Sequence, residues 1–294
     1  CHPDAPATVT DYVASHGDAM TRQSCDTDVA VYFDAALKAL PAAGTAWISP
    51  FVTDVWRHMK ASYGACAVPR SLPAPIGPGC ENFGAPKPAL AMFHQGKHGG
   101  GTVANRFDAF ASFRTTIDVG DSGWSVSNGV LHDEIVHEAC HQVEGASQGV
   151  HESPAFSVWG DSKWAEFCVY DFYARTGRSA DADRVLKLFT GSRDNLPAGA
   201  QGAAWFRDWF LPLWKDGGSN ATVMQRYFGL LSQYFPTRAE NSGRNVIYTR
   251  RMTTGEFVHF SSAAAGKDLS ARAATAFGAG FSRAEFDQAR TDFP

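Results

Sequence analysis

Apolar residues recur at helical spacing over most of the second half of this chain. Positions three or four residues apart are apolar, while the positions between them are mostly polar, as on a helix with one buried face. The pattern predicts helices over residues 181–189, 203–215, 222–234, 268–277 and 282–290. Ser282-Arg283-Ala284-Glu285 has the form of a capping box at the start of the last one. Pro212 should end or kink the second, because proline has no backbone N–H.

The first half of the chain mixes two patterns. Helical spacing covers residues 28–40, which end at Pro41, and residues 51–63. Residues 89–94 and 107–119 are instead typical of strands, and the second of these alternates in part. The order of these segments predicts a small sheet accompanied by helices.

Two further helices are predicted near the middle of the chain. Ser127 or Asn128 is a fair N-cap for a helix that runs to about Glu144. Another helix should cover residues 163–174. The many prolines and glycines between 69 and 88 predict an irregular surface loop.

These elements predict an α+β fold with two lobes. A mixed lobe would occupy residues 1–176, and a mainly helical lobe would occupy 177–294, both forming one catalytic unit. The composition of the 294 residues, 44% hydrophobic and 19% charged, suits a folded globular protein. With a net charge of −4 and no run of Lys or Arg, nucleic acid is not an expected partner. No apolar stretch is long enough for a transmembrane segment, and we expect a monomer.

Six cysteines, an even number, indicate disulfides and an oxidising compartment, so we expect a secreted, extracellular protein. Six cysteines allow 15 pairings. Local order favours Cys1–Cys25 and Cys66–Cys80, which leaves Cys140–Cys168 as the third pair. The chain starts at Cys1 rather than Met, so we expect that a signal peptide was removed, although an N-terminal Cys also suits a lipid-anchored protein.

The most informative stretch is His137-Glu138-Ala139-Cys140-His141, an HExxH sequence inside a predicted helix. Two imidazoles four residues apart on one helical face are about 6 Å apart along the axis. Both can therefore bind one Zn²⁺ ion at roughly 2.1 Å. Glu138 is then left to act as a general base on a water molecule.

Around this motif, over residues 130–174, the chain resembles the zincin metallopeptidases, in particular the gluzincins. The segment from Trp164 to Tyr170 is similar to the helix that carries their third zinc ligand, a glutamate. The resemblance implies Glu166 as that ligand, at a spacing found in mucin-peptidase-like enzymes. Phe167 stands where these families usually have glycine. The resemblance also implies a zincin-like lobe with a small sheet and an active-site helix.

Other side chains compete for the third position. His151, Asp161 and Asp171 all follow the motif within reach. The metzincin pattern, which would use a later histidine, fails because Glu144 and Ser147 stand where it needs glycine and histidine. If His141 and Glu166 share one ion, a Cys140–Cys168 disulfide would brace the two helices.

The implied mechanism needs an oxyanion donor besides zinc. His259 is the candidate in the C-terminal half, and Tyr170 and Tyr173 are nearer in sequence. His259 also fits an ordinary core histidine. Glu138 would pass the proton from water to the leaving amine.

Three rival functions have some sequence support. His98-Gly99-Gly100-Gly101 and Gly145-Ala146-Ser147-Gln148-Gly149 match the HGGG and GxSxG motifs of serine esterases, although a helix rather than a strand is predicted before Ser147. The 13% aromatic residues, with Trp159 and Trp164 after the motif, leave open a hydrolase of glycans or glycoproteins. A non-catalytic, zinc-stabilised binding module would have no use for Glu138. The sequence favours a zinc metallohydrolase, an endopeptidase acting on a protein or glycoprotein substrate.

Overall fold

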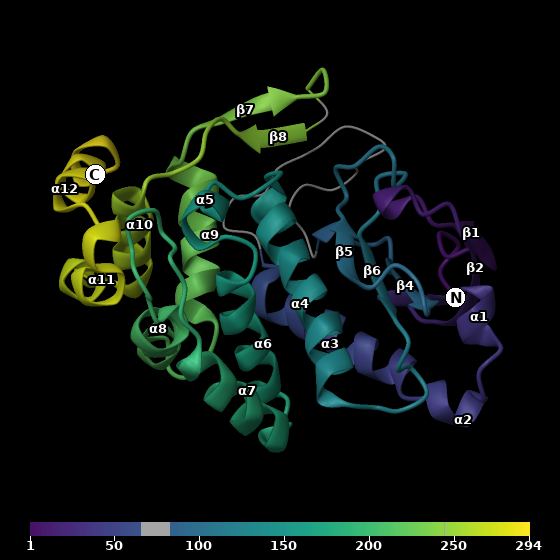
Figure 1. Cartoon of the computed structure of the whole chain (residues 1–294). Helices are drawn as coiled ribbons and strands as arrows, with labels where there is room; N and C mark the ends of the chain where they lie inside the picture. Colours follow the sequence, from purple (N-terminus) through teal and green to yellow (C-terminus); the bar gives the residue numbers. More distant parts are fainter. Residues whose placement is uncertain (66–82, 244) are drawn as a thin grey trace. The chain divides into compact units, whose positions relative to one another are not determined.

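The computed structural model describes residues 1–65, 83–243 and 245–294 (Figure 1). The chain divides into two compact units. The first consists of Cys1–Ala65, the described part of Pro69–Gly149, and Asn241–Asn245, and the second contains Val150–Glu240 and Val246–Pro294. The main division at Gly149 falls earlier than the expected lobe boundary at residue 176, because the helix of Glu166 belongs to the second unit.

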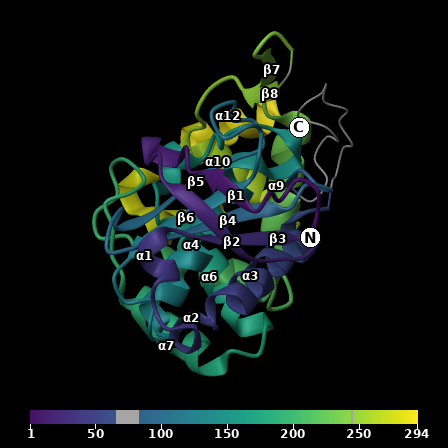
Figure 2. The ribbon, with the colours of Figure 1, turned by 90° about the vertical axis from the view of Figure 1, so that its right-hand side faces the viewer.

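The first unit is built on a six-stranded sheet with the strand order β1-β2-β3-β4-β6-β5 (Figures 1 and 2). The strands are β1 (Thr8–Thr10), β2 (Ala19–Cys25), β3 (Val29–Phe33), β4 (Ala89–Gln95), β5 (Gly100–Ala104) and β6 (Thr116–Asp121). β3, β4 and β6 are parallel, while β5 runs antiparallel to β6 at one edge. Mixed helix and strand content around this sheet agrees with the predicted α+β class.

The predicted helix over 28–40 is wrong. Val29–Phe33 forms β3, which lies between β2 and β4 with all five residues buried, and only Ala35–Lys38 (α1) is helical. A parallel strand covered on both faces has a continuous apolar sequence, which periodicity alone cannot distinguish from a buried helix. The disulfide between Cys1 and Cys25 confirms the first predicted pair.

The predicted strand over 107–119 is correct only from Thr116 onward. The preceding segment turns, because the Asp108 carboxylate accepts the Asn105 N–H and the Asn105 amide oxygen accepts the Phe107 N–H, groups that a strand would need. The predicted strand over 89–94 is confirmed by β4. The Cys66–Cys80 pair and most of the predicted loop over 69–88 lie outside the described residues.

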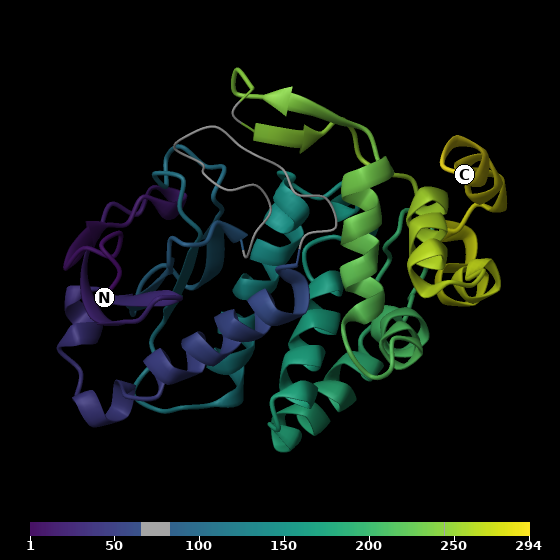
Figure 3. The same cartoon turned by 180° about the vertical axis from the view of Figure 1, so that it is seen from behind.

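Helices α3 (Ile48–Tyr63) and α4 (Gly129–Ala146) pack side by side, as Figures 1 and 3 show, and α2 (Ala42–Thr45) precedes them. α3 and α4 confirm the helices predicted over 51–63 and up to about Glu144. Asn128 is the N-cap of α4, where its side-chain oxygen accepts the N–H groups of Val130 and Leu131. α4 packs on β5 and β6, so the HExxH motif rests against the edge of the sheet.

Side chains alternate between the two faces of the sheet. Gly101 is paired with Val119 and lies against Glu138, so both belong to the face that α4 covers. His94 and Asp118 belong to the other face, on which Met92 packs with the N-terminal strands. The two faces therefore carry different chemistry.

The second unit is mainly helical. Its helices are α5 (Phe156–Trp159), α6 (Lys163–Arg175), α7 (Ser179–Gly191), the π-helical turn Trp205–Phe210, α8 (Leu211–Asp216), α9 (Thr222–Tyr234), α10 (Thr254–Ala265), α11 (Ser270–Phe277) and α12 (Arg283–Asp292). A hairpin of β7 (Thr237–Glu240) and β8 (Asn245–Tyr248) accompanies them. Short 3-10 turns occur at Val13–Ser15, Ser147–Gly149 and Gly278–Gly280.

The helices predicted in this half are confirmed, with two corrections. α10 was not predicted, and it carries the capping box with both hydrogen bonds, between Thr253 and Glu256. Ser282 caps α12 through the Glu285 N–H, but the Glu285 carboxylate accepts from Gly255 instead of closing the predicted box. Pro212 stands in the first turn of α8, where the π-helical turn ends. In the described part of the chain, no helix has the length and apolar character that crossing a bilayer requires.

Candidate metal centre

The two histidines of the HExxH motif face each other on α4. The Nε2 atoms of His137 and His141 are 2.9 Å apart, and the two side chains come from successive turns of the same helix face. Together with Glu138, they form a group whose ligand atoms lie within 4.8 Å of one another. This is the arrangement that a shared metal ion requires of an HExxH pair.

A buried carboxylate fixes the orientation of one of these rings. The Nδ1 atom of His141 lies 3.0 Å from Oε2 of Glu144, which is 5% exposed. In most protein metal sites the ligating imidazole donates its other N–H to such an acceptor. Nδ1 bound to Glu144 leaves Nε2 as the ligand atom, so the donor set fits a metal ion at the His137–His141 pair. Sequence reasoning identified Glu144 only as a departure from the metzincin pattern.

Glu138 is held between α4 and the edge strand. Its side chain is 6% exposed, and a Cβ added to Gly101 of β5 would lie 2.3 Å from the Glu138 Cγ atom. Only glycine allows this close approach. One turn further, the Gln142 amide donates to the carbonyls of Ala104 on β5 and Thr116 on β6, each at 2.7 Å. These contacts fix Glu138 and Gln142 against β5, the edge strand of the described sheet.

Glu166, the predicted third ligand, lies on α6 in the second unit. Its Oε1 accepts from Lys163 at 2.7 Å and from Ser192 at 3.2 Å. Its Oε2 is buried and has no hydrogen-bond partner among the described residues. Burial raises the pKa of this carboxyl, while Lys163 opposes the shift. An unsatisfied buried oxygen fits a metal ligand, and its pairing with the motif stays a prediction because the two lie in different units.

The competing ligands have other contacts within the second unit. Asp171 is fully buried and accepts from the Trp214 indole N–H at 2.7 Å. His151 Nδ1 lies 3.0 Å from a carboxylate oxygen of Glu240. Asp161 is exposed in the turn before α6. None of these observations favours one of the three over Glu166.

The predicted oxyanion donor His259 lies on α10 in the second unit. Its Nε2 donates to the carbonyl oxygen of Phe293 at 2.8 Å, and its ring stacks on that residue. These contacts are typical of a histidine that fixes the C-terminal helix. Tyr170 packs against Phe206 and Trp214. A catalytic role for His259 stays a prediction.

The esterase motifs are not arranged as a nucleophile elbow. Ser147 follows α4 directly, and its buried hydroxyl donates back to the Val143 carbonyl. The elbow requires a strand before the serine and a helix after it. The glycines of the HGGG stretch lie in the turn before β5 and in β5 itself.

The tryptophans that suggested carbohydrate binding belong to the core. Trp159 and Trp164 are fully buried and stack on each other in the second unit. They therefore offer no exposed platform to a sugar. Cys140 and Cys168 are both disulfide-bonded, which agrees with the expected use of cysteine, and their pairing with each other stays a prediction.

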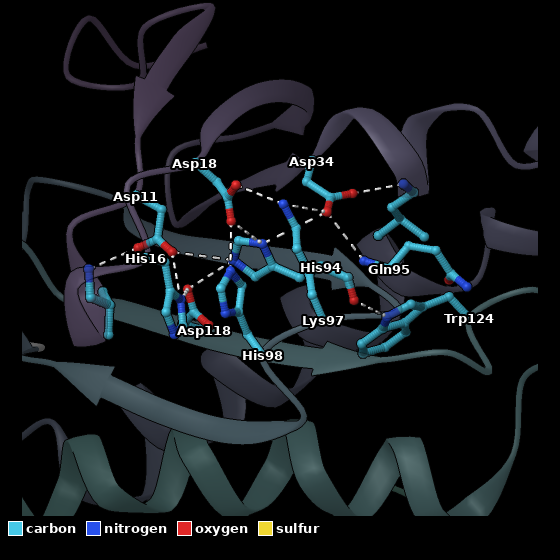
Figure 4. Close-up of polar contacts among 12 residues, drawn as sticks. Asp11, His16, Asp18, Asp34, His94, Gln95, Lys97, His98, Asp118 and Trp124 are labelled. Atoms are coloured by element: carbon cyan, nitrogen blue, oxygen red, sulfur yellow. Dashed lines mark hydrogen bonds and ion pairs between the residues drawn. The ribbon is translucent and has the colours of Figure 1, made fainter.

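A second group of potential metal ligands was not predicted from the sequence. Asp11, His16, His94 and Asp118 converge on the face of the sheet opposite α4 (Figure 4). Burial alone would lower the pKa of His94, but hydrogen bonds with the Asp11 and Asp118 carboxylates raise it to about 9. Burial and the nearby Asp11 charge raise the pKa of Asp118.

This group has only a weak signal in the sequence. Its members come from the β1–β2 loop and from two strands, and no fixed spacing joins them. The available signal is a polar residue inside an apolar strand segment: His94 in ALAMFH and Asp118 in TIDV.

Comparison with known proteins adds little to this geometry. No protein-family model matches the chain, and no curated protein matches it. A crystal structure of a functionally unknown conserved protein from Bacillus anthracis is similar at 10% identity with a TM-score of 0.46. The alignment covers 94% of this chain, which spans about half (52%) of that structure.

Proposed function

We propose that this protein is a secreted zinc metallohydrolase, with an endopeptidase activity of the gluzincin type. His137 and His141 hold the metal, and Glu138 is the general base. One observation carries the proposal: two Nε2 atoms converge at 2.9 Å while the glutamate between them is buried under an edge strand. A purely structural zinc site closes all four positions with ligands and has no role for such a glutamate.

Glu166 is our choice for the third ligand. Its support is the resemblance of the segment around it to a gluzincin ligand helix and its buried, unsatisfied Oε2 atom. Two histidines and a glutamate form the ligand set of many catalytic zinc sites, which keep a fourth position open for water or substrate.

The substrate would bind along β5. This strand is paired on one side only, by β6, in the described sheet. An extended peptide can add to such an edge through backbone hydrogen bonds. Because Gly101 of β5 lies against Glu138, a peptide on this edge would pass beside the base. In this proposal, as in the zincins, an edge strand binds the substrate and the active-site helix carries the metal ligands and the base.

Bound zinc would supply Lewis-acid polarisation of a carbonyl oxygen and make water acidic enough to lose a proton near pH 7. Glu138 takes the proton of the attacking water and then donates it to the leaving amine nitrogen as the C–N bond breaks. Glu144 holds the His141 ring in the tautomer that presents Nε2. Gln142 keeps α4 in register with β5 while the substrate is bound.

A location outside the cell is part of the proposal. The Cys1–Cys25 disulfide is compatible with an oxidising compartment. Substrates there would be proteins or glycoproteins. Hydrolysis of a glycosidic rather than a peptide bond is the alternative, and the buried tryptophans give it no specific support.

The substitution Glu138→Gln tests the proposal. The variant should keep its zinc content while hydrolysis of unfolded proteins, with and without glycans, falls by about 10²–10⁴-fold. Glu134→Gln, the same change one helical turn earlier on α4, is the matched control and should retain activity. Normal turnover in Glu138→Gln would refute the mechanism, and release of sugars alone would refute the peptidase assignment.

A further inference from the structure

The β1–β2 loop brings two potential metal ligands onto the sheet. Asp11 accepts the Val13 N–H at 2.8 Å through its Oδ1 atom, which directs its Oδ2 atom toward the sheet. Ala14 and Ser15 adopt the left-handed backbone conformation, with φ values of 46° and 64°. This tight path returns His16 to the same place, 2.9 Å from Asp11.

Two strand residues complete a compact set of four. The Nε2 atom of His94 lies 3.2 Å from Asp11 Oδ2 and 3.1 Å from Asp118 Oδ2. The Nδ1 atom of His16 lies 2.9 Å from Asp11 Oδ2 and 3.6 Å from Asp118 Oδ2. Figure 4 shows the four side chains pointing toward one another.

These distances match the edges of a zinc coordination tetrahedron. Bonds of about 2.0–2.1 Å give an edge of about 3.3 Å between neighbouring ligand atoms. The four nitrogen–oxygen distances, from 2.9 to 3.6 Å, lie on both sides of that value. All four ligand atoms lie within 4.8 Å of one another. An ion at the centre would therefore need only small side-chain movements.

Charge and burial favour a cation here. Asp11, His94 and Asp118 are at most 1% exposed, on a sheet face that also carries the apolar cluster of Leu90 and Met92. Within the described chain, no lysine or arginine pairs with Asp11 or Asp118, since Lys97 contacts Asp18 and Asp34 instead. Buried carboxylates are costly unless paired or bound to a metal. The partners of the two carboxylates are His16 and His94, and a divalent ion bound among the four side chains would neutralise both carboxylates.

The surroundings of the second ring nitrogen of His94, Nδ1, are also typical of a metal-ligating histidine. Its Nδ1 atom is buried and has no hydrogen-bond partner among the described residues, and Asp18 Oδ2 lies 3.4 Å away. A carboxylate at this place is the usual outer partner of a ligating imidazole, because metal binding at Nε2 makes the Nδ1–H a stronger donor. Asp18 is itself held by His98 at 2.7 Å.

We propose that Asp11, His16, His94 and Asp118 bind a second divalent metal ion of the zinc class. Two imidazoles with two carboxylates suit Zn²⁺, whereas Ca²⁺ and Mg²⁺ prefer oxygen ligands alone. Four protein ligands leave no open position, so the ion is structural. It fastens the β1–β2 loop to β4 and β6. This site shares no residue with the HExxH group, and its test does not depend on hydrolysis.

Metal content measures the site directly. The unaltered protein, desalted after zinc loading, should carry two zinc ions per chain. The double variant His137→Gln, His141→Gln should keep one, and Co²⁺ in that variant should give the strong visible absorption of four-coordinate cobalt. A folded double variant that binds neither Zn²⁺ nor Co²⁺ would overturn the proposal. The proposal would also fail if the unaltered protein carried one zinc ion and the double variant carried none.

A single ligand change then locates the ion. In the double-variant background, His16→Ala should weaken Co²⁺ binding by at least about 100-fold. Loss of a residue that only hydrogen-bonds to a ligand typically weakens metal binding by about 10–100-fold. His16 is the least buried of the four, with 14% side-chain exposure, so this variant is the most suitable for folding. His58→Ala on α3 is the control and should bind as the background does. Equal binding by both variants would place the ion elsewhere and contradict the assignment.

Discussion

The two histidine–carboxylate groups of the first unit lie on opposite faces of one sheet and are built differently. The HExxH group comes from five consecutive residues on α4. The His94 group joins a loop and two strands that are far apart in the sequence. The first places the buried Glu138 carboxylate beside an edge strand, and in the second four potential ligands face inward. This difference is why we propose a catalytic role for the first group and a structural role for the second.

The short segment from His98 to Gly101 contacts residues of both groups or beside them. His98 contacts Asp18 beside the His94 group, while Gly101, three residues later, lies against Glu138. The sequence of this segment matches the HGGG motif of serine esterases. In the structure it is the turn from β4 into β5 and the start of β5. Gly101 is needed because its backbone lies against the Glu138 side chain, and Gly100 has a positive φ of 92°, which favours glycine.

Replacing Gly101 should have the largest effect on the catalytic side. In Gly101→Ala the new Cβ would lie 2.3 Å from the Glu138 Cγ, so the carboxylate must shift. We expect hydrolysis to fall by about 100-fold, because displacing a catalytic group by about 1 Å has that order of effect. Gly99→Ala, where nothing lies within 4 Å, is the control. Equal steady-state rates for the two variants would contradict the position of Glu138.

Loss of the Glu144 carboxylate should weaken metal binding at the motif. Glu144→Gln removes the charged partner of His141 Nδ1. Zinc affinity, measured by competition with a chelator, should fall about 10–100-fold. Unchanged affinity would show that the ring is oriented by other contacts.

Loss of the second metal should appear as lower stability. An ion at 100 times its dissociation constant contributes about 2.7 kcal/mol, and about 2–4 °C in Tm corresponds to each kcal/mol in a unit of this size. His16→Ala in excess zinc should therefore melt about 5–10 °C below the unaltered protein by calorimetry. His58→Ala should not, and an equal shift in both would contradict a structural ion.

The metal-free protein should show a pH dependence that zinc removes. The folded pKa of His94 is raised from 6.5 to about 9. Its protonation therefore stabilises the fold fully below pH 6.5, and this contribution is lost as the pH rises toward 9. Urea unfolding in the presence of a chelator should show the decline between these values, and bound zinc should abolish it by displacing the proton. A flat profile without metal would contradict the raised pKa.

The sequence predicts most of the helices because each has one buried face and a clear end. α9 matches its predicted range, and the N-cap of α4 is Asn128 as expected. Long amphipathic segments of this kind carry a strong periodic signal. α10 was missed because its buried residues include Gly255, Glu256, Ser261 and Ser262, so apolar spacing does not mark its buried face.

Strands and the second site were harder to predict. The buried sequence of β3 resembles a helix core, and β5 begins with two glycines, which have little strand propensity. The motif ligands are local and therefore visible in the sequence. Asp11, His16, His94 and Asp118 meet only through the register of β4 and β6 and the path of one loop. Such a group depends on tertiary structure alone.

The most direct test of the central claim is an anomalous difference map at the zinc edge from a crystal of the zinc-loaded protein. We predict a peak about 2.0–2.1 Å from the Nε2 atoms of both His137 and His141, with a carboxylate, Glu166, as the third protein ligand. Absence of zinc density beside that pair, with the two imidazoles still 2.9 Å apart and bonded to each other, would contradict the account.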